Sequence, residues 1–295
     1  MILQQADTAM YRSKVSGRNA VSFFHASMQE AADLRLNLEQ DIRAAIDNGR
    51  FILCYQPQVD AGGSVLSSEA LIRWEHLDKG MILPVDFIPL AEESSLILAI
   101  GRWVLLEACN QIKDWQDKGI NLPHISVNVS SRQFRQQDFV GQVKHAINIS
   151  GIAPHLLGIE LTESVMIVDI NDTIAKMKAL KALGISIAVD DFGTGYSSLM
   201  YLKQLPIDTL KIDQGFVRDI LTDASDAVIV ETIISMAQHL NLYIVAEGVE
   251  TAEQLALLKQ KGCQAFQGYY FSHPLPAAEY AEMYFDTFLE TIESQ

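Results

Sequence analysis

The stretch from Leu157 to Asp191 has the sequence LGIELTESVMIVDINDTIAKMKALKALGISIAVDD, which contains the repeating unit of the fold. Its apolar start predicts a strand, and Asp172–Leu183 predicts an amphipathic helix. Gly184 stands where this helix must reverse, since glycine readily adopts the left-handed conformation that ends many helices. The apolar run Ile185–Val189 predicts the next strand. A strand, a helix and a second strand in this order form a parallel βαβ unit.

The same alternation extends along most of the chain. Strands are predicted at Phe51–Val59, Val65–Trp74, Ile125–Val129, Leu157–Leu161, Ile185–Val189, Thr209–Ile212, Tyr243–Ala246 and Ala265–Gly268. Helices are predicted at Leu98–Lys118, Phe139–Ile149, Asp172–Leu183, Asp226–Leu240, Ala252–Lys261 and after Pro276. Strands that mostly alternate with helices in this number predict an α/β fold, a (β/α)8 barrel of the TIM type.

Two local signals refine this barrel. The turn Asp60-Ala61-Gly62-Gly63 joins the first two strands directly, which is typical of a hairpin. We therefore expect a modified TIM-type barrel whose first strand is antiparallel. Thr251 followed three residues later by Gln254 forms a capping box that places a helix start at residue 252.

The segment before the barrel divides into two parts. Residues 29–48 predict a helix with apolar residues four apart, interpreted as a linker or docking element. These residues are Leu34, Leu38, Ile42 and Ile46. Residues 1–28 predict one helix and one strand, which alone could bury little. The barrel domain is then expected at residues 49–295.

Composition and charge narrow the function. The formal net charge of −15 argues against a DNA or RNA polymer as partner, because such binding needs Lys and Arg facing phosphates. Cys54, Cys109 and Cys263 form no Cys-x-x-Cys pair and predict buried free thiols in a reducing compartment. Neither a signal peptide nor a run of about 18 apolar residues is found. We therefore expect a cytoplasmic protein, with no membrane contact in this fragment.

Polar side chains gather near the predicted carboxyl ends of seven strands, which form one rim in a β/α barrel. They are Glu69, Asn128, Glu160, Glu163, Asp190, Asp191, Lys211, Asp213, Glu247, Glu250 and Gln267. Several carboxylates on one rim repel one another unless cations neutralise them. Oxygen-only ligands select hard metals such as Mg²⁺ or Mn²⁺. The adjacent Asp190 and Asp191 suit a pair of metals, the arrangement used for in-line displacement at phosphorus, with Lys211 as the lone cation in the ring.

Each feature has a simpler explanation when it is taken alone. A strand-end acid is more often a solvated loop residue or a helix N-cap, and Asp190–Gly193 fits a turn. The loop Gly193–Ser198 lacks the full spacing of a phosphate-binding glycine loop. Tyr196, Tyr269 and Tyr270 fit base stacking or simple packing. Only the occurrence of polar side chains near the ends of seven strands together favours the metal site over these explanations.

Eight motifs occur in order between residues 38 and 276. They are Tyr55-Gln56-Pro57-Gln58, Glu69-Ala70-Leu71-Ile72-Arg73-Trp74, Val127-Asn128-Val129-Ser130, Glu160-Leu161-Thr162-Glu163, Asp190-Asp191-Phe192-Gly193-Thr194-Gly195, Leu210-Lys211-Ile212-Asp213, Ala246-Glu247-Gly248-Val249-Glu250 and Gln267-Gly268. With these motifs the chain resembles the EAL family of cyclic-di-GMP phosphodiesterases. The resemblance implies hydrolysis of cyclic-di-GMP to the linear dinucleotide pGpG by two-metal in-line attack of water.

The resemblance also implies roles for individual residues. The implied metal ligands are Glu69, Asn128, Glu160, Asp190, Asp191 and Glu247. Lys211 would contact the attacking water and Glu247 is a candidate general base, so the catalytic set is Glu69, Asp190, Asp191, Lys211 and Glu247. The implied substrate contacts are Gln56, Leu71, Arg73, Asp213 and Gln267. Glu163 and Glu250 would hold the loop after Asp191, and that loop implies a homodimer.

Residues 1–28 resemble the end of a GGDEF diguanylate cyclase domain, through Ala6–Tyr11 and Gly17–Asn19. The chain is therefore interpreted as part of a longer signalling protein. A rival hypothesis is a non-catalytic receptor for cyclic-di-GMP, and a third keeps the chemistry with another dinucleotide. The metal-binding acids, Lys211 and the loop motif are all present, which favours the enzyme.

Overall fold

The computed structural model describes residues 10, 23–120, 124–167, 169–194 and 199–284. The chain forms two compact units, Met1–Phe51 with Trp74–Ile97, and Ile52–Arg73 with Leu98–Gln295. The segments that suggested a cyclase remnant, Ala6–Tyr11 and Gly17–Asn19, lie outside the described residues except for Met10. Among the described residues, no helix is both long and apolar enough to cross a membrane.

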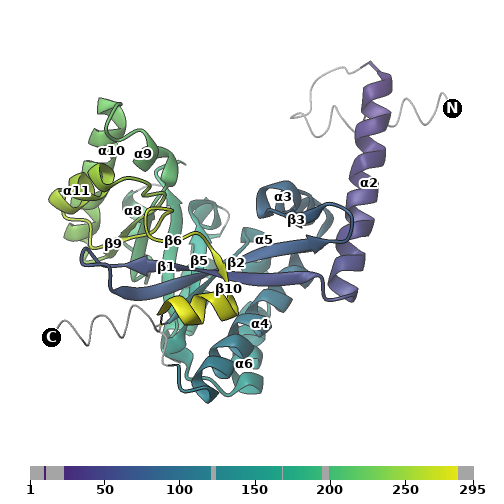
Figure 1. Cartoon of the computed structure of the whole chain (residues 1–295), viewed down its shortest axis with the longest axis horizontal. Coiled ribbons are helices and arrows are strands. Elements are labelled where there is room, and N and C mark those ends of the chain that lie inside the picture. The colour runs from purple at the N-terminus through teal and green to yellow at the C-terminus, as the bar shows by residue number, and fades with distance from the viewer. Residues whose placement is uncertain (1–9, 11–22, 121–123, 168, 195–198, 285–295) are drawn as a thin grey trace. The chain divides into compact units, whose positions relative to one another are not determined.

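Eight strands form a closed barrel in the larger unit (Figure 1). They are β1 (Phe51–Val59), β2 (Val65–His76), β4 (Ile125–Val129), β5 (Leu157–Thr162), β6 (Ser186–Phe192), β7 (Thr209–Ile212), β8 (Tyr243–Ala246) and β9 (Ala265–Phe266). Strands β2 and β4 to β9 pair in parallel, in chain order. Strand β1 pairs with β2 and lies antiparallel to β9, which closes the ring. The predicted barrel with an antiparallel first strand is confirmed.

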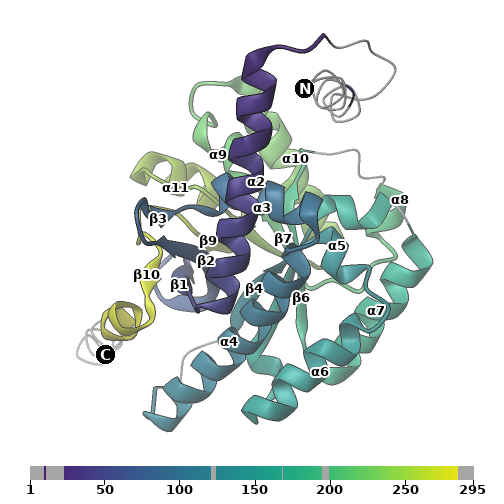
Figure 2. The same cartoon turned by 90° about the vertical axis from the view of Figure 1, so that its right-hand side faces the viewer.

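Helices cover the outside of the barrel, and Figure 2 shows α6 and α7 alongside the strands β4 to β6. The long helices of this unit are α4 (Ile97–Asp117), α6 (Phe139–Ser150), α7 (Ile170–Leu183), α10 (Ala224–His239) and α11 (Ala252–Gln260). The short ones are α5 (Ser131–Phe134), α8 (Leu199–Leu202) and α9 (Gln214–Arg218), with 3-10 turns η1 (Pro154–Leu156) and η2 (Glu163–Ile167). The helix expected after Pro276 is present from residue 277 to the last described residue, 284.

Local sequence signals explain where these helices begin and end. Thr251 Oγ1 accepts from Gln254 N, and Gln254 Oε1 accepts from Thr251 N, so the predicted capping box is confirmed. Gly184 ends α7 with φ of 95°, and its N–H bonds back to the last turn. The parallel strands are covered on both faces, which explains their nearly continuous apolar sequences. Val127, Ile159 and Leu210, for example, are fully buried.

Three predicted strands end two or three residues away from the observed end, each for a tertiary reason, and the other strand boundaries differ by at most one residue. Strand β2 continues to His76 because it pairs with β3 (Gly80–Ile82). Strand β6 continues to Phe192 through an irregularity in its pairing with β7. Strand β9 ends at Phe266 because the carbonyl of Gln267 accepts from Val249 N, in the loop after β8, although Gln267 N still donates to Ala246 O on β8. A further short strand, β10 (Leu275–Pro276), pairs antiparallel with β1.

The smaller unit contains α2 (Ala26–Asp47), α3 (Pro84–Ser94) and β3. Helix α2 corresponds to the helix predicted at residues 29–48. Ile42 is fully buried whereas Leu34 is 70% exposed, so only the second half of the predicted apolar stripe is covered. The rings of Phe51, Trp74 and Phe87 pack together with centroids 5.6 to 6.0 Å apart and form the centre of this unit.

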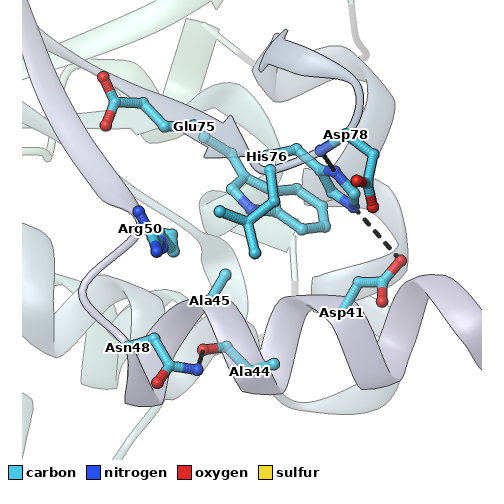
Figure 3. Close-up of a pocket in the computed structure, with 10 residues that line it drawn as sticks. Asp41, Ala44, Ala45, Asn48, Arg50, Glu75, His76 and Asp78 are labelled. Carbon is cyan, nitrogen blue, oxygen red and sulfur yellow. Dashed lines mark hydrogen bonds and ion pairs between the residues drawn. The ribbon is translucent and has the colours of Figure 1, made fainter.

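A cavity of about 320 Å³ lies between α2 and the end of β2 (Figure 3). His76 crosses it, with Nε2 3.5 Å from Asp41 Oδ2. The backbone N–H groups of Asp78 and Lys79 donate to His76 Nδ1, at 3.1 and 3.3 Å. Since Nδ1 is an acceptor, the ring proton lies on Nε2 and faces Asp41. His76 therefore joins the helix to the strand inside this unit.

Gly268 follows the barrel strand β9 at a point where a side chain has no room. A Cβ on this residue would lie 2.1 Å from Val249 O and 2.3 Å from Val249 N. We predict that Gly268→Ala lowers the free energy of unfolding by about 1–3 kcal/mol through the backbone shift, in addition to any conformational cost. In Gly119→Ala the added Cβ enters open space at φ of 76°, so only the conformational cost of about 1–2 kcal/mol applies. Chemical denaturation of both variants checks this, and an equal loss in the two would contradict it.

Candidate functional site

A buried lysine lies at the centre of the polar rim. Lys211, on β7, is fully buried, and its ammonium contacts four carboxylates, of Glu69, Glu160, Asp190 and Glu247. Nζ lies 3.2 Å from Glu69 Oε2, 3.3 Å from Asp190 Oδ1 and 2.5 Å from Glu247 Oε1. These acids come from β2, β5, β6 and the residue after β8. The barrel thus brings together side chains separated by up to 178 residues.

A bulge in β6 places two consecutive aspartates near this cluster. Val189 pairs with Leu210 and Phe192 with Ile212, so β6 contains one extra residue there. Asp191 has φ of 53°, a left-handed conformation that Asp tolerates better than most residues. Neighbouring side chains on a regular strand point to opposite faces. Here Asp190 and Asp191 instead come within 4.8 Å of each other and of Glu247, oxygen to oxygen.

Amide side chains hold Glu69 in addition to Lys211. Asn128 Nδ2 donates to Glu69 Oε1, and Gln267 Nε2 donates to Glu69 Oε2 at 2.7 Å. Gln267 Nε2 also donates to Gln56 Oε1 at 3.0 Å, and Gln56 Nε2 donates to Ser272 O at 3.0 Å. Both oxygens of Glu69 are therefore held in place by donors.

The other predicted substrate residues lie around the same strand ends. Leu71 and Arg73 are half-buried near the end of β2, and Arg73 Nη1 donates to Ile72 O at 2.8 Å. Asp213 follows β7 and caps α9, with Oδ1 accepting from Gly215 N at 2.8 Å. Asp213 and Glu250 both line a cavity of about 300 Å³.

The two acids predicted to hold the loop differ in burial. Glu163 is buried, and its Oε2 accepts from Gly193 N, two residues after Asp191, at 3.2 Å. The side chain of Glu250 is exposed. Tyr196 lies outside the described residues, while Tyr269 and Tyr270 are exposed at 57% and 46%.

No role was predicted for Gln58, although it belongs to the same motif as Gln56. Gln58 is buried and donates to Gln267 Oε1 at 3.0 Å. Residues two apart on a strand share a face, so this spacing could have indicated that Gln56 and Gln58 both approach the site.

The EAL domain family matches residues 39–274. The chain belongs to the EAL family. The bifunctional diguanylate cyclase/cyclic di-GMP phosphodiesterase MucR of Pseudomonas aeruginosa is 44% identical over 279 residues, which cover 94% of this chain and 41% of MucR. The cyclic di-GMP phosphodiesterase PdeR of Escherichia coli K12 is 40% identical over 283 residues, 96% of this chain and 43% of PdeR.

Solved structures agree with this assignment. The structure of the PaMucR phosphodiesterase in its c-di-GMP complex is 43% identical with a TM-score of 0.80, and the match covers 82% of this chain and 99% of that one. The chain spans about two-fifths of the length of the full-length relatives MucR and PdeR.

The electrostatics of this EAL domain show a carboxylate excess that one lysine does not neutralise. Burial raises the pKa of Glu160 to about 8, and repulsion from Glu69 and Asp190 adds to the effect against the attraction of Lys211. Burial and repulsion from Asp190 raise the pKa of Glu247 well above its usual value. Burial opposes ionisation of Glu69, but Lys211, Gln267 and Asn128 together lower its pKa.

The pKa values of Asp191 and Lys211 are also shifted by burial and by neighbouring charges. Burial and the neighbouring Asp190 raise the pKa of Asp191 to about 6. Burial disfavours the charged form of Lys211, yet the surrounding carboxylates raise its pKa well above the usual value. The cluster therefore needs further positive charge before all of its acids ionise near neutral pH.

The donor set fits divalent cations. Two groups of acids have ligand oxygens within 4.8 Å of one another, Glu69 with Glu160 and Asp190, and Asp190 with Asp191 and Glu247. Asp190 belongs to both groups, so one carboxylate is shared. All the donors are oxygens, as hard ions such as Mg²⁺ and Mn²⁺ prefer.

These pKa values predict how stability depends on pH in the metal-free EAL domain. Between its ordinary pKa of 4.5 and about 8, Glu160 holds a proton in the folded chain and not in the unfolded one. Stability therefore falls as the pH rises through this range. Divalent ions displace such protons, so Mn²⁺ should bind more tightly at higher pH and abolish the fall.

Thermal unfolding between pH 5 and 8, with EDTA and with Mn²⁺, checks this expectation. Glu160→Gln removes one of the titrating groups and should make the EDTA curve less steep, while Asp191 and Glu247, whose pKa values are also raised, keep part of the fall. A melting temperature that rises with pH in EDTA would contradict the account.

Proposed function

We propose that this EAL domain hydrolyses one phosphodiester bond of cyclic-di-GMP to give the linear dinucleotide pGpG. The observation that carries this proposal is the buried Lys211 surrounded by four carboxylates, beside the aspartate pair at the β6 bulge. Support comes from the names of the relatives MucR and PdeR, both given as cyclic di-GMP phosphodiesterases. The c-di-GMP complex of the PaMucR phosphodiesterase supports the same substrate.

In this proposal two divalent ions, Mg²⁺ or Mn²⁺, are held by Glu69, Asn128, Glu160, Asp190, Asp191 and Glu247. When bound, these ions supply Lewis acidity and an activated water for in-line displacement at phosphorus. Asn128 already donates to Glu69, so it would orient that carboxylate or turn its oxygen to an ion. Asp190 is the carboxylate common to both ligand groups.

Lys211 and Glu247 are proposed to act on the reacting atoms. The Lys211 ammonium is fixed by its four carboxylates and cannot rotate away, so it would stabilise negative charge that develops on the phosphoryl oxygens. Glu247 lies 2.5 Å from Lys211 Nζ and has a raised pKa, which suits a group that accepts the proton of the attacking water.

Substrate contacts are proposed for Gln56, Leu71, Arg73, Asp213 and Gln267. Arg73 offers positive charge to a phosphate, and Leu71 offers an apolar surface at the same strand end. Gln56 and Gln267 are buried and bonded to each other. Their contacts with the substrate would therefore involve a rearrangement of this pair. Glu163 and Glu250 are proposed to hold the loop after Asp191.

The remaining proposals concern the whole protein. Residues 1–28 are proposed to end a GGDEF domain, residues 29–48 to form a linker or docking helix, and residues 49–295 to form the EAL barrel. MucR, whose name includes a diguanylate cyclase, supports such a tandem arrangement. A homodimer and a cytoplasmic location stay predictions from the sequence.

Turnover of cyclic-di-GMP tests the proposed function. We expect pGpG to appear by chromatography with Mg²⁺ or Mn²⁺, and to disappear with EDTA or in Glu69→Ala, because the carboxylate cluster loses its ions. Glu231→Ala, the same substitution at an exposed acid on α10 that pairs with Lys261, is the matched control and should keep full activity. Tight binding of cyclic-di-GMP without product would favour the receptor hypothesis. Faster turnover of the adenine analogue or of pGpG would favour another substrate.

Replacing Mg²⁺ by Ca²⁺ distinguishes the binding of cyclic-di-GMP from its hydrolysis. Ca²⁺ accepts oxygen ligands at longer and looser distances than Mg²⁺, so it positions an attacking water badly. We predict that Ca²⁺ supports binding of cyclic-di-GMP but allows little hydrolysis, as measured by calorimetry and single-turnover kinetics. Equal hydrolysis rates with Ca²⁺ and Mg²⁺ would contradict the proposed two-metal site.

A further inference from the structure

A pair of buried glutamines links two of the proposed metal-binding carboxylates. Gln58 Nε2 faces Glu160 Oε1 at 3.5 Å and Gln267 Oε1 at 3.0 Å. Gln267 Nε2 in turn donates to Glu69 Oε2 at 2.7 Å. Gln58 and Gln267 are each 4% exposed, so water does not compete for these bonds. The hydrogen bonds therefore run from Glu160 to Glu69 through two amides.

The direction of the bonds between these residues is determined from the Glu69 end. The carboxylate of Glu69 is paired with the Lys211 ammonium and only accepts hydrogen bonds, so Gln267 must turn its NH₂ group toward it. The Oε1 of Gln267 then faces Gln58, which must turn its own NH₂ group toward that oxygen. If Gln267 turned over, its oxygen would face the acceptors Glu69 Oε2 and Gln56 Oε1.

Ser67, which is not one of the residues that link Glu160 to Glu69, supports the same orientation of Gln58. Its hydroxyl donates to Gln58 Oε1 at 2.5 Å, and Ser67 is also buried. The oxygen of Gln58 is thereby satisfied, while its NH₂ group is directed to Glu160 and Gln267. Gln58 thus uses its oxygen and its NH₂ group within the protein, which leaves the amide little freedom to turn toward a ligand.

We propose that Gln58 is a positioning residue of the metal site, which fixes the amide of Gln267 and through it the carboxylate of Glu69. This inference rests on the proposed metal-dependent function and adds a residue to it. Gln58 touches neither the substrate nor the ions in this role. It sets the orientation of Glu69 relative to Glu160 before either acid receives an ion. Preorganisation of this kind lowers the cost of assembling the ligand oxygens around a cation.

Replacement of Gln58 by methionine tests this role. Methionine fills a similar volume but donates no hydrogen bond, so Gln267 Oε1 loses its donor. We expect the Kd for Mn²⁺, measured by calorimetry without substrate, to rise roughly tenfold, as for other groups that orient metal ligands. The value of kcat should fall while KM for cyclic-di-GMP changes little.

The matched control is Gln133→Met, the same substitution at a glutamine that is 2% exposed on α5. This variant should bind Mn²⁺ as the unmodified chain does. Should Gln58→Met fold poorly, Ser67→Ala offers a milder variant, because it removes only the hydroxyl that orients Gln58. It should weaken Mn²⁺ binding less than Gln58→Met.

A double substitution shows whether Gln58 acts through Gln267. The effects of Gln58→Met and Gln267→Met on the Kd for Mn²⁺ should be less than additive in free energy, because both break the same chain of bonds. Unchanged Mn²⁺ affinity in folded Gln58→Met, or full additivity, would overturn the proposal. Absence of turnover in the unmodified chain would instead count against the proposed function, and the Mn²⁺ comparison would still test Gln58.

Discussion

The contact between the Lys211 ammonium and four carboxylates, three of them on buried residues, is the constraint on which the rest of the site depends. Removing a charged group from water costs several kcal/mol, and this cost is recovered only through close opposite charge and well-placed donors. Burial raises the pKa of Glu160 and that of Glu247, and repulsion between the carboxylates raises both further because one lysine cannot balance four acids. The remaining excess of negative charge favours the binding of cations by the cluster.

The barrel supplies the rigidity that such a cluster requires. Glu69, Glu160 and Lys211 lie on three strands whose pairing fixes their separations, and flexible loops contribute none of the three. The bulge in β6 adds what a regular strand could not, two consecutive aspartates near one point. The amides of Asn128, Gln58 and Gln267 then decide how the carboxylates are turned. Stability and function thus compete at this rim, because the acids repel one another whenever cations are absent.

Much of the fold could be predicted from the sequence, because apolar runs and amphipathic helices alternate with little ambiguity. The hairpin glycines at residues 62 and 63 indicated the antiparallel first strand, and the capping box indicated the start of α11. The ends of β2, β6 and β9 could not be predicted, since pairing with β3, the bulge and the crowding at Gly268 depend on distant residues. The position of the acids near the carboxyl ends of the predicted strands indicated which of them converge. It contained no information on hydrogen-bond direction, so Gln58 received no role.

The most direct test of the account is a crystal structure of this chain with Mn²⁺ and cyclic-di-GMP, with the ions located by anomalous scattering. The account predicts two ions, one among Glu69, Glu160 and Asp190 and one among Asp190, Asp191 and Glu247, with a phosphate of the dinucleotide beside them and Lys211 still in place. Cyclic-di-GMP bound at the strand ends with no ion among these carboxylates would contradict it.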